Sequence, residues 1–378
     1  MTRLLIALLV AMPCLLSGQA PSTALRAGRA RNVILFLADA AGIPTLNAAS
    51  IHGHGAPRKL FVQRMPHIAL SETSTASQFV TDSAAGMTAI VTGVRTHNGV
   101  LAQGPDAVRA KKDGAPLKTI LEYAEERGMA TGVISNDSLT GATPAALYAK
   151  VNDRGMEAEI FLQAFTPRFG DGVDVMIGAG RADVEQALET KGQSLQALER
   201  RHGRPILDSL HAIPRNGSRA IVLLDDEEFD LGAAVRAAVQ MLSRNPNGYF
   251  LMVESDSHTD SIRQGLDRVV TFDRVIEQMT PALARDSLVL FTADHSFDLR
   301  VYNGRWGKPL LTGVAAEGGD GALSVRLPNV RMDDDHTGEE VLVAAQGPGS
   351  ERVRGYLANT DLFHVMMSAF GWVAPATR

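Results

Sequence analysis

The stretch NVILFLAD at Asn32–Asp39 decides the fold class, and two later stretches repeat its pattern. Gly248–Glu254 is GYFLMVE and Ser287–His295 is SLVLFTADH. Each is a run of β-branched and large apolar residues, as expected for a strand covered on both faces, and each stops at acidic or imidazole side chains. Ligands of open parallel sheets bind beyond the carboxyl ends of the strands. We therefore expect these side chains to meet in one crevice as a metal site.

Strand and helix patterns alternate along the rest of the chain. Strand patterns lie at 32–39, 130–135, 174–178, 219–224, 248–254, 287–293 and 341–345. Helical patterns lie at 83–93, 116–128, 154–165, 182–201, 231–244, 265–285 and 360–370. Such alternation favours a parallel or mixed sheet with helices on both faces. We predict an α/β fold, a three-layer α/β/α sandwich around a central, mostly parallel sheet.

The first twenty residues have the pattern of a secretory signal peptide. Arg3 precedes an apolar run at Leu4–Leu16, and Gly18-Gln19-Ala20 supplies a small-x-small cleavage site. No stretch approaches the roughly 20 apolar residues that a membrane span needs. We therefore expect a signal peptide at 1–20 and a periplasmic or secreted protein. Cys14, the one cysteine, lies in the apolar run, so zinc would be held by nitrogen and oxygen.

Composition indicates a globular protein with a substantial core, since 45% of the 378 residues are hydrophobic and 21% are charged. The net charge is −5 and no basic stripe is present, which argues against a nucleic-acid surface. No Pro/Ser-rich linker divides 21–378, so we expect a single catalytic domain. Within it, 182–230 has the weakest pattern and is expected as an accessory lobe, and Gly-rich 299–330 as an excursion near the active face.

The sequence Thr81-Asp82-Ser83-Ala84-Ala85-Gly86 allows two interpretations. It is typical of a helix N-cap, which by itself is the more common meaning. Alternatively, Ser83 is a nucleophile, because a helix N-terminus and an adjacent cation both stabilise an alkoxide. No Gly-x-Ser-x-Gly elbow accompanies it, which weighs against an α/β-hydrolase triad.

Several motifs follow one another along the chain and together span nearly the whole mature chain. They are Asn32–Gly42, Val80–Gly99, Ala142–Tyr148, Phe250–Glu254, Thr292–Ser296 and His336–Gly349. The combination of Asp-Ser-Ala-Ala-Gly, Thr-Ala-Asp-His-Ser and a downstream His-Thr-Gly-Glu is specific, and the chain resembles the alkaline phosphatase family. The resemblance implies an exported phosphomonoester hydrolase that forms a phosphoserine, binds two zinc ions and one magnesium ion, and acts on small-molecule phosphomonoesters.

The resemblance also implies roles for individual residues. Ser83 would be the nucleophile and would contact a zinc ion held by Asp39, Asp294 and His295. His336 would lie on the second zinc. Two such ions can stabilise the entering and leaving oxygens of an in-line displacement.

Glu254 and Thr143, with Asp39 bridging, would hold magnesium, whose preference is for oxygen ligands. Arg154 would grip two phosphoryl oxygens with its guanidinium. Local sequence alone also fits Arg154 as a solvated helix arginine. Gly141 stands where well-studied members carry Asp or His, so magnesium occupancy stays open.

The largest departure from the family pattern follows Glu254. If the backbone stays extended, Glu254, Asp256 and His258 point to one side as a ligand comb. If a helix starts early, Asp256 and Asp260 share a face. We predict that Asp256 and His258 join His336 on the second zinc, with Asp260 as the alternative.

Other functions remain to be compared with a phosphomonoesterase. A phosphodiesterase or sulfatase of the same superfamily would keep the metal set, and a metal-independent serine hydrolase would need a histidine base. A catalytically impaired metal-binding relative is suggested by Ala38, Ala40 and Gly141, which depart from the family pattern. Both a homodimer and a monomer fit the sequence.

Overall fold

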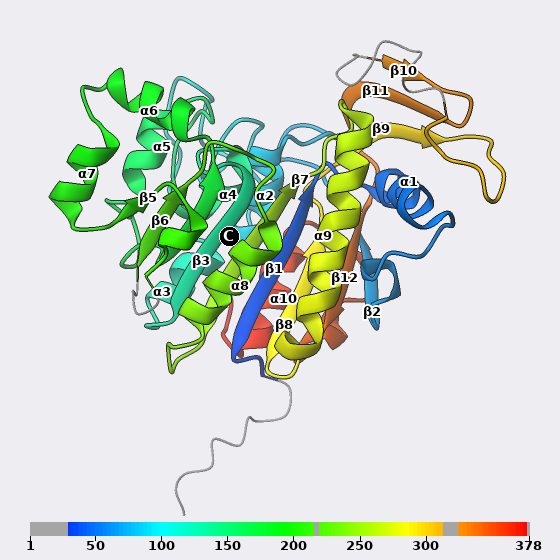
Figure 1. Cartoon of the computed structure of the whole chain (residues 1–378). Helices are drawn as coiled ribbons and strands as arrows, with labels where there is room; N and C mark the ends of the chain where they lie inside the picture. Colours follow the sequence, from blue (N-terminus) through cyan, green and yellow to red (C-terminus); the bar gives the residue numbers. More distant parts are fainter. Residues whose placement is uncertain (1–28, 215–218, 313–323, 376–378) are drawn as a thin grey trace, which may run out of the picture.

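The computed structural model describes residues 29–214, 219–312 and 324–375, and has a large sheet between two layers of helices (Figure 1). The sheet has ten strands. In spatial order they are β13 (Gly355–Leu357), β2 (His67–Ser71), β12 (Val341–Gln346), β8 (Ser287–Thr292), β1 (Asn32–Asp39), β7 (Tyr249–Asp256), β3 (Ala130–Ser138), β4 (Val175–Ala179), β6 (Ala220–Leu223) and β5 (Ile206–Leu207). Strands β8 to β5 run parallel, whereas β12 is antiparallel to β8 and β2. The predicted α/β sandwich is confirmed.

Strand β1 lies in the middle of the sheet and shows why its sequence is an unbroken apolar run. All of its residues are buried. Val33, Leu35 and Leu37 pack into the core on one face, and Ile34 and Phe36 pack into the core on the other. Because successive side chains of a strand point to opposite faces, a strand covered on both sides needs apolar residues at every position.

Helices cover both faces of the sheet. One face carries α2 (Ser83–Thr92), α3 (Ile120–Glu125), α4 (Ala142–Tyr148), α5 (Glu157–Gln163), α6 (Arg181–Glu189), α7 (Leu195–His202) and α10 (Asp361–Phe370). The other carries α1 (Ile43–His54), α8 (Leu231–Leu242) and α9 (Ile262–Leu283), of which α9 crosses the front of the sheet in Figure 1. Single-turn 3-10 helices lie at Val62–Arg64, Leu210–Ala212 and Ser350–Arg352. None of the helices in the described ranges is both long and apolar enough to cross a membrane.

A second, three-stranded antiparallel sheet lies beyond one end of the large sheet (Figure 1). It is built from β9 (Ser296–Val301), β10 (Ser324–Arg326) and β11 (Val330–Thr337) in the order β10-β11-β9. Its apolar side chains, such as Phe297 and Met332, join the core that contains α1 and α9. The end of β9, the whole of β10 and the first residue of β11 fall within 299–330, the region expected as an excursion.

Several elements differ from the sequence prediction. The helix expected at 154–165 begins at Glu157, so Arg154 lies in a turn and not on a helix. The helix expected at 182–201 is two helices, because Gly192 takes a left-handed φ of 64° between them. Helices α1 and α4 were not predicted. Residues 182–230, expected as an accessory lobe, include β5 and β6, which extend the large sheet beside β4. The expected signal peptide lies outside the described residues.

Candidate active site

The carboxyl ends of three neighbouring strands bring the acidic side chains together. In the parallel register, Asp39 of β1 pairs with Asp256 of β7, and the end of β8 leads directly into Asp294 and His295. The ligand atoms of Asp39, Asp294 and His295 all lie within 4.8 Å of one another, and the three residues are buried. Ala40, directly after β1, has a φ of 63°. That conformation costs an alanine roughly 1–2 kcal/mol, and it lets the Ala40 amide point at Asp294 Oδ1, 3.3 Å away.

Ser83 is the first residue of α2 and faces this cluster. Its side chain is buried, and its Oγ lies 3.4 Å from His295 Nε2. Asp82 caps the helix, because its Oδ1 accepts from the Ala85 amide at 3.0 Å. The capping and the functional interpretations of this sequence are therefore compatible, since neighbouring residues carry them.

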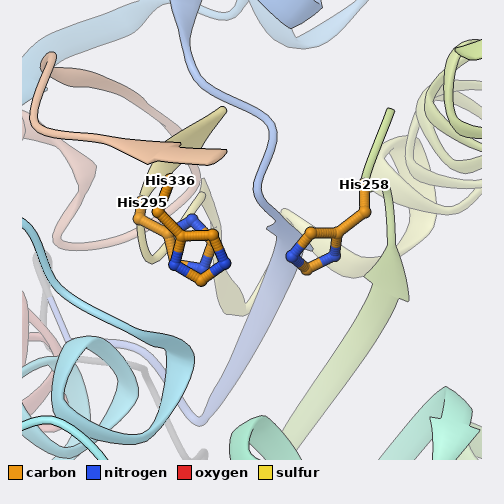
Figure 2. Close-up of side chains that lie close together, drawn as sticks. All are labelled: His258, His295 and His336. Carbon is orange, nitrogen blue, oxygen red and sulfur yellow. The ribbon is translucent and has the colours of Figure 1, made fainter. Parts of the chain in front are cut away.

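Three histidines form a second cluster beside the first (Figure 2). The ligand nitrogens of His258, His295 and His336 lie within 4.8 Å of one another. Figure 2 shows the rings of His295 and His336 overlapping, with His258 facing them; the stacked pair has a centroid separation of 3.8 Å. His295 takes part in both clusters.

Each histidine is held through Nδ1. The Nδ1 of His295 lies 3.1 Å from the Ser296 carbonyl, and that of His336 lies 3.2 Å from the Thr81 carbonyl. A carbonyl only accepts, so Nδ1 carries the proton in both rings, and Nε2 is left with its lone pair. This is the arrangement of metal-binding histidines, in which the second nitrogen fixes the ring.

Asp256 contacts the third histidine with one carboxylate oxygen and Arg268 with the other. Its Oδ1 lies 2.6 Å from His258 Nδ1, and its Oδ2 accepts from Arg268 Nη1 at 2.7 Å. Arg268 also forms ion pairs with Glu227 and Glu228 at 3.0 and 2.7 Å. Asp256 was expected as a metal ligand beside His258; it is in neither of the two clusters found among the described residues, and its observed contacts are those that orient the His258 ring.

Asp260 is exposed, and its Oδ1 accepts from the Ser261 amide at 2.8 Å. It takes no part in either of the two clusters found among the described residues. His258, by contrast, lies close to His336, with ring centroids 5.6 Å apart.

Thr143 and Glu254 come from elements that neighbour Asp39. Thr143, on α4, donates its hydroxyl to Asp39 Oδ2 at 3.1 Å. Glu254 of β7 is 1% exposed.

Arg154 comes from the turn before α5 and lies against Asp82, with Nη1 3.3 Å from Asp82 Oδ2. Its side chain is 35% exposed, so it is a group at the rim of the site and not a fully solvated one.

Unpaired buried oxygens test whether cations fit these residues. Asp39 Oδ1, Asp294 Oδ2 and Glu254 Oε2 have no hydrogen-bond partner among the described residues, although His295 Nε2 lies 3.3 Å from Asp39 Oδ1 and 3.7 Å from Asp294 Oδ2. A buried carboxylate oxygen without a partner is costly, and a cation would supply one. Nitrogen and oxygen donors at these separations suit zinc-like ions in the two clusters, and the oxygen-only set around Glu254 suits a harder ion.

Burial and the carboxylates gathered at the site shift the pKa values of Asp294, Glu254 and His258. Burial and the neighbouring Asp39 raise the pKa of Asp294 to about 6, and they also raise the pKa of Glu254. Although burial opposes it, the carboxylates of Asp39 and Asp256 raise the pKa of His258 to about 10. Burial and the adjacent His295 lower the pKa of His336 to about 4, which keeps this ring neutral and able to ligate.

Two groups at the site were not found from the sequence. Arg268 lies on α9, twelve residues after Asp256, and an arginine on a helix has no local signal for such a contact. Asn136, whose Oδ1 accepts from the Asp256 amide at 2.6 Å, lies just past the strand predicted at 130–135. The observed β3 extends to Ser138 and carries it into the site.

Comparisons with known proteins identify the family of this chain. A sequence model described as alkaline phosphatase matches residues 30–222 and 224–309. The streptomycin-6-phosphate phosphatase of Streptomyces griseus is 29% identical, over 96% of this chain and 96% of its own length. The alkaline phosphatase of Escherichia coli (strain K12) is 28% identical, over 90% of this chain and 86% of its own length.

Solved structures show the same fold. The alkaline phosphatase of Thermus thermophilus superposes with a TM-score of 0.75 at 22% identity, covering 91% of this chain and 92% of that one. The alkaline phosphatase of the Antarctic bacterium TAB5 superposes with a TM-score of 0.72 at 24% identity, covering 92% of this chain and 100% of that one. Since the family's sequence model spans well over half of its residues, the chain belongs to the alkaline phosphatase family, whose members are metal-dependent phosphoester hydrolases.

Proposed function

We propose that this protein is an exported phosphomonoester hydrolase that acts through a phosphoserine at Ser83. The observation that carries the proposal is the position of Ser83 Oγ, at the N-terminus of α2 and 3.4 Å from His295, the residue shared by both clusters. Zinc is proposed for the two clusters and magnesium for the oxygen ligands around Glu254. When bound, such cations would favour the Ser83 alkoxide and neutralise charge on the phosphoryl oxygens.

The proposed reaction has two displacements at phosphorus. Ser83 Oγ attacks the phosphorus, the bond to the ester oxygen breaks, and the alcohol leaves. Water then attacks the phosphoserine, the Ser83–phosphorus bond breaks, and inorganic phosphate is released. The amide dipoles at the start of α2 favour negative charge on Ser83 Oγ. Arg154, at the rim beside Asp82, is proposed to bind two phosphoryl oxygens.

The leaving group is proposed to occupy a groove of about 780 Å³ that opens beside His336. Phe79, Asp334 and Asp335 are among the residues that line it, and all three are exposed. An acidic, partly aromatic wall favours an alcohol that carries positive charge. Streptomycin 6-phosphate, the compound in the name of the Streptomyces griseus relative, is therefore one candidate substrate.

Replacing Ser83 by alanine tests the covalent route. Turnover of p-nitrophenyl phosphate should fall by at least about a thousandfold, because removal of a catalytic nucleophile leaves mainly binding and electrostatic effects. Acid-quenched wild-type enzyme should yield a phosphorylated peptide that contains Ser83. Ser243→Ala, at an exposed serine that follows α8, is the matched control. Undiminished turnover in Ser83→Ala would rule out the phosphoserine.

The same assay with different esters tests the reaction class. A phosphomonoesterase should turn over p-nitrophenyl phosphate and streptomycin 6-phosphate faster than a phosphodiester or a sulfate ester of p-nitrophenol. Faster turnover of the diester or the sulfate would favour the related activities. No turnover of any ester by metal-loaded protein would favour a catalytically impaired relative.

A further inference from the structure

Asp137 is an acidic residue at the active end of the sheet that no motif singles out. It belongs to β3, which lies beside β7, and β7 in turn lies beside β1. The register pairs Ser135 with Glu254, and Asp137 follows two residues later. The acidic ends of three adjacent strands therefore meet at one edge of the sheet.

The carboxylate of Asp137 occupies the space where a side chain at position 141 would begin. A Cβ atom built on Gly141 would lie 2.9 Å from Asp137 Oδ2 and 2.8 Å from the Ser138 carbonyl oxygen. Such approaches are too short for any residue except glycine. Gly141 caps α4, two residues before Thr143. The close approach of the Ser138 carbonyl favours glycine at 141, and the absence of a side chain there leaves room for the Asp137 carboxylate.

A buried, unpaired oxygen lies among these groups. Glu254 Oε2 has no hydrogen-bond partner among the described residues, and Glu254 is 1% exposed. After burial, the nearby carboxylates of Asp39 and Asp137 raise the pKa of Glu254. Burial, with Asp256 and Asp39 nearby, likewise raises the pKa of Asp137 to about 6. Several carboxylates that repel one another around an unpaired oxygen are the environment in which a cation binds.

We propose that Asp137 is part of the hard-cation site of Glu254 and Thr143, where its carboxylate supplies the negative charge that a side chain at position 141 cannot. This inference deepens the proposed function and rests on it. An oxygen-only set of carboxylates and a hydroxyl suits Mg²⁺, which keeps several waters and is held by few protein ligands. Asp137 acts either on the ion directly or on one of those waters, and in both cases its removal weakens binding.

Magnesium binding to the zinc-loaded, full-length protein tests the inference. Calorimetric titration with MgCl₂ should show at least about a tenfold loss of Mg²⁺ affinity in Asp137→Asn, which is the effect expected for an outer or inner ligand. The rise in melting temperature on adding Mg²⁺ should shrink in parallel. Asp208→Asn, at an exposed aspartate, is the matched control and should bind Mg²⁺ as the wild type does.

Moving the carboxylate distinguishes loss of a ligand from loss of structure. Asp137→Glu moves the carboxylate by one methylene group and keeps its charge, and we expect it to recover at least part of the Mg²⁺ affinity that Asp137→Asn loses. Wild-type affinity in Asp137→Asn, or no Mg²⁺ binding by the wild type, would overturn the inference. Phosphorylation of Ser83 is measured independently of Mg²⁺ binding. A failure of this inference can therefore be distinguished from a failure of the proposed function.

Discussion

At the scale of single residues, the site depends on how each histidine is oriented. Backbone carbonyls hold His295 and His336, whereas His258 relies on the side chain of Asp256. Asp256 is in turn held by Arg268, which is itself paired with two glutamates. A side-chain relay of this kind is easier to perturb than a backbone contact, because each member has its own rotamers.

We predict that Arg268→Gln lowers zinc affinity by about tenfold, because Asp256 is then free to turn away from His258. The zinc dissociation constant, measured by chelator competition, should change together with kcat/KM, and Arg268→Lys should restore part of both. Arg263→Gln, an exposed change on the same helix, should leave both unchanged. Zinc affinity equal to that of the wild type in Arg268→Gln would show that Asp256 needs no support.

At the scale of elements, the end of α3 packs a carboxyl group into the core beside β3. Glu125 is 6% exposed, and its oxygens accept from the Thr131 hydroxyl at 3.1 Å and the Gly172 amide at 3.0 Å. Burial outweighs these hydrogen bonds and raises the pKa of Glu125 to about 8. The folded protein therefore holds a proton here that the unfolded chain loses near pH 4.5.

The sign of the resulting pH dependence follows from this raised pKa. The stability that protonated Glu125 contributes is fully present below about pH 4.5 and is lost as pH rises through about 8. Between about pH 5 and about pH 9 we expect the free energy of unfolding of the wild type to fall by a few kcal/mol relative to Glu125→Gln, which cannot titrate. Urea unfolding at several pH values measures this difference, and Glu126→Gln, an exposed neighbour, is the control. A constant difference across the range would contradict the prediction.

At the scale of the whole molecule, the two clusters connect separate parts of the fold. Asp39 and His258 come from the region of β1 and β7, Asp294 and His295 follow β8, and His336 lies on β11 of the small sheet. A cation that binds these residues joins both sheets, and it binds the folded state in preference to the unfolded chain.

Metal removal should therefore lower stability as well as activity. With free zinc at about 100 times its dissociation constant, we expect the folded state to gain about 3 kcal/mol over chelator-treated protein. Calorimetry in chelator and in zinc measures the gain. His336→Ala should lose much of it, whereas His52→Ala, on α1 away from the clusters, should keep it. Identical melting curves with and without zinc would argue against metal sites here.

Local sequence predicted the elements that carry most of the site. The strand at Asn32–Asp39 has the predicted bounds, and α2 begins at Ser83 as predicted. Prediction was poorer where tertiary contacts decide an element. Arg154 lies in a turn, and β3 extends past its apolar run to carry Asp137 into the site, because neither feature has a periodic pattern of its own.

The amino-acid sequence alone determined which segments become buried strands and which of them end in acidic or imidazole groups, because burial on both faces demands an unbroken apolar run. Tertiary structure alone decided how those groups are used. It brought Asp256 Oδ1 within 2.6 Å of His258 Nδ1, left Glu254 Oε2 without a hydrogen-bond partner among the described residues, and placed His295 3.4 Å from a serine 212 residues away. Such outcomes depend on strand register and helix packing, which join residues whose local sequences carry no information about one another.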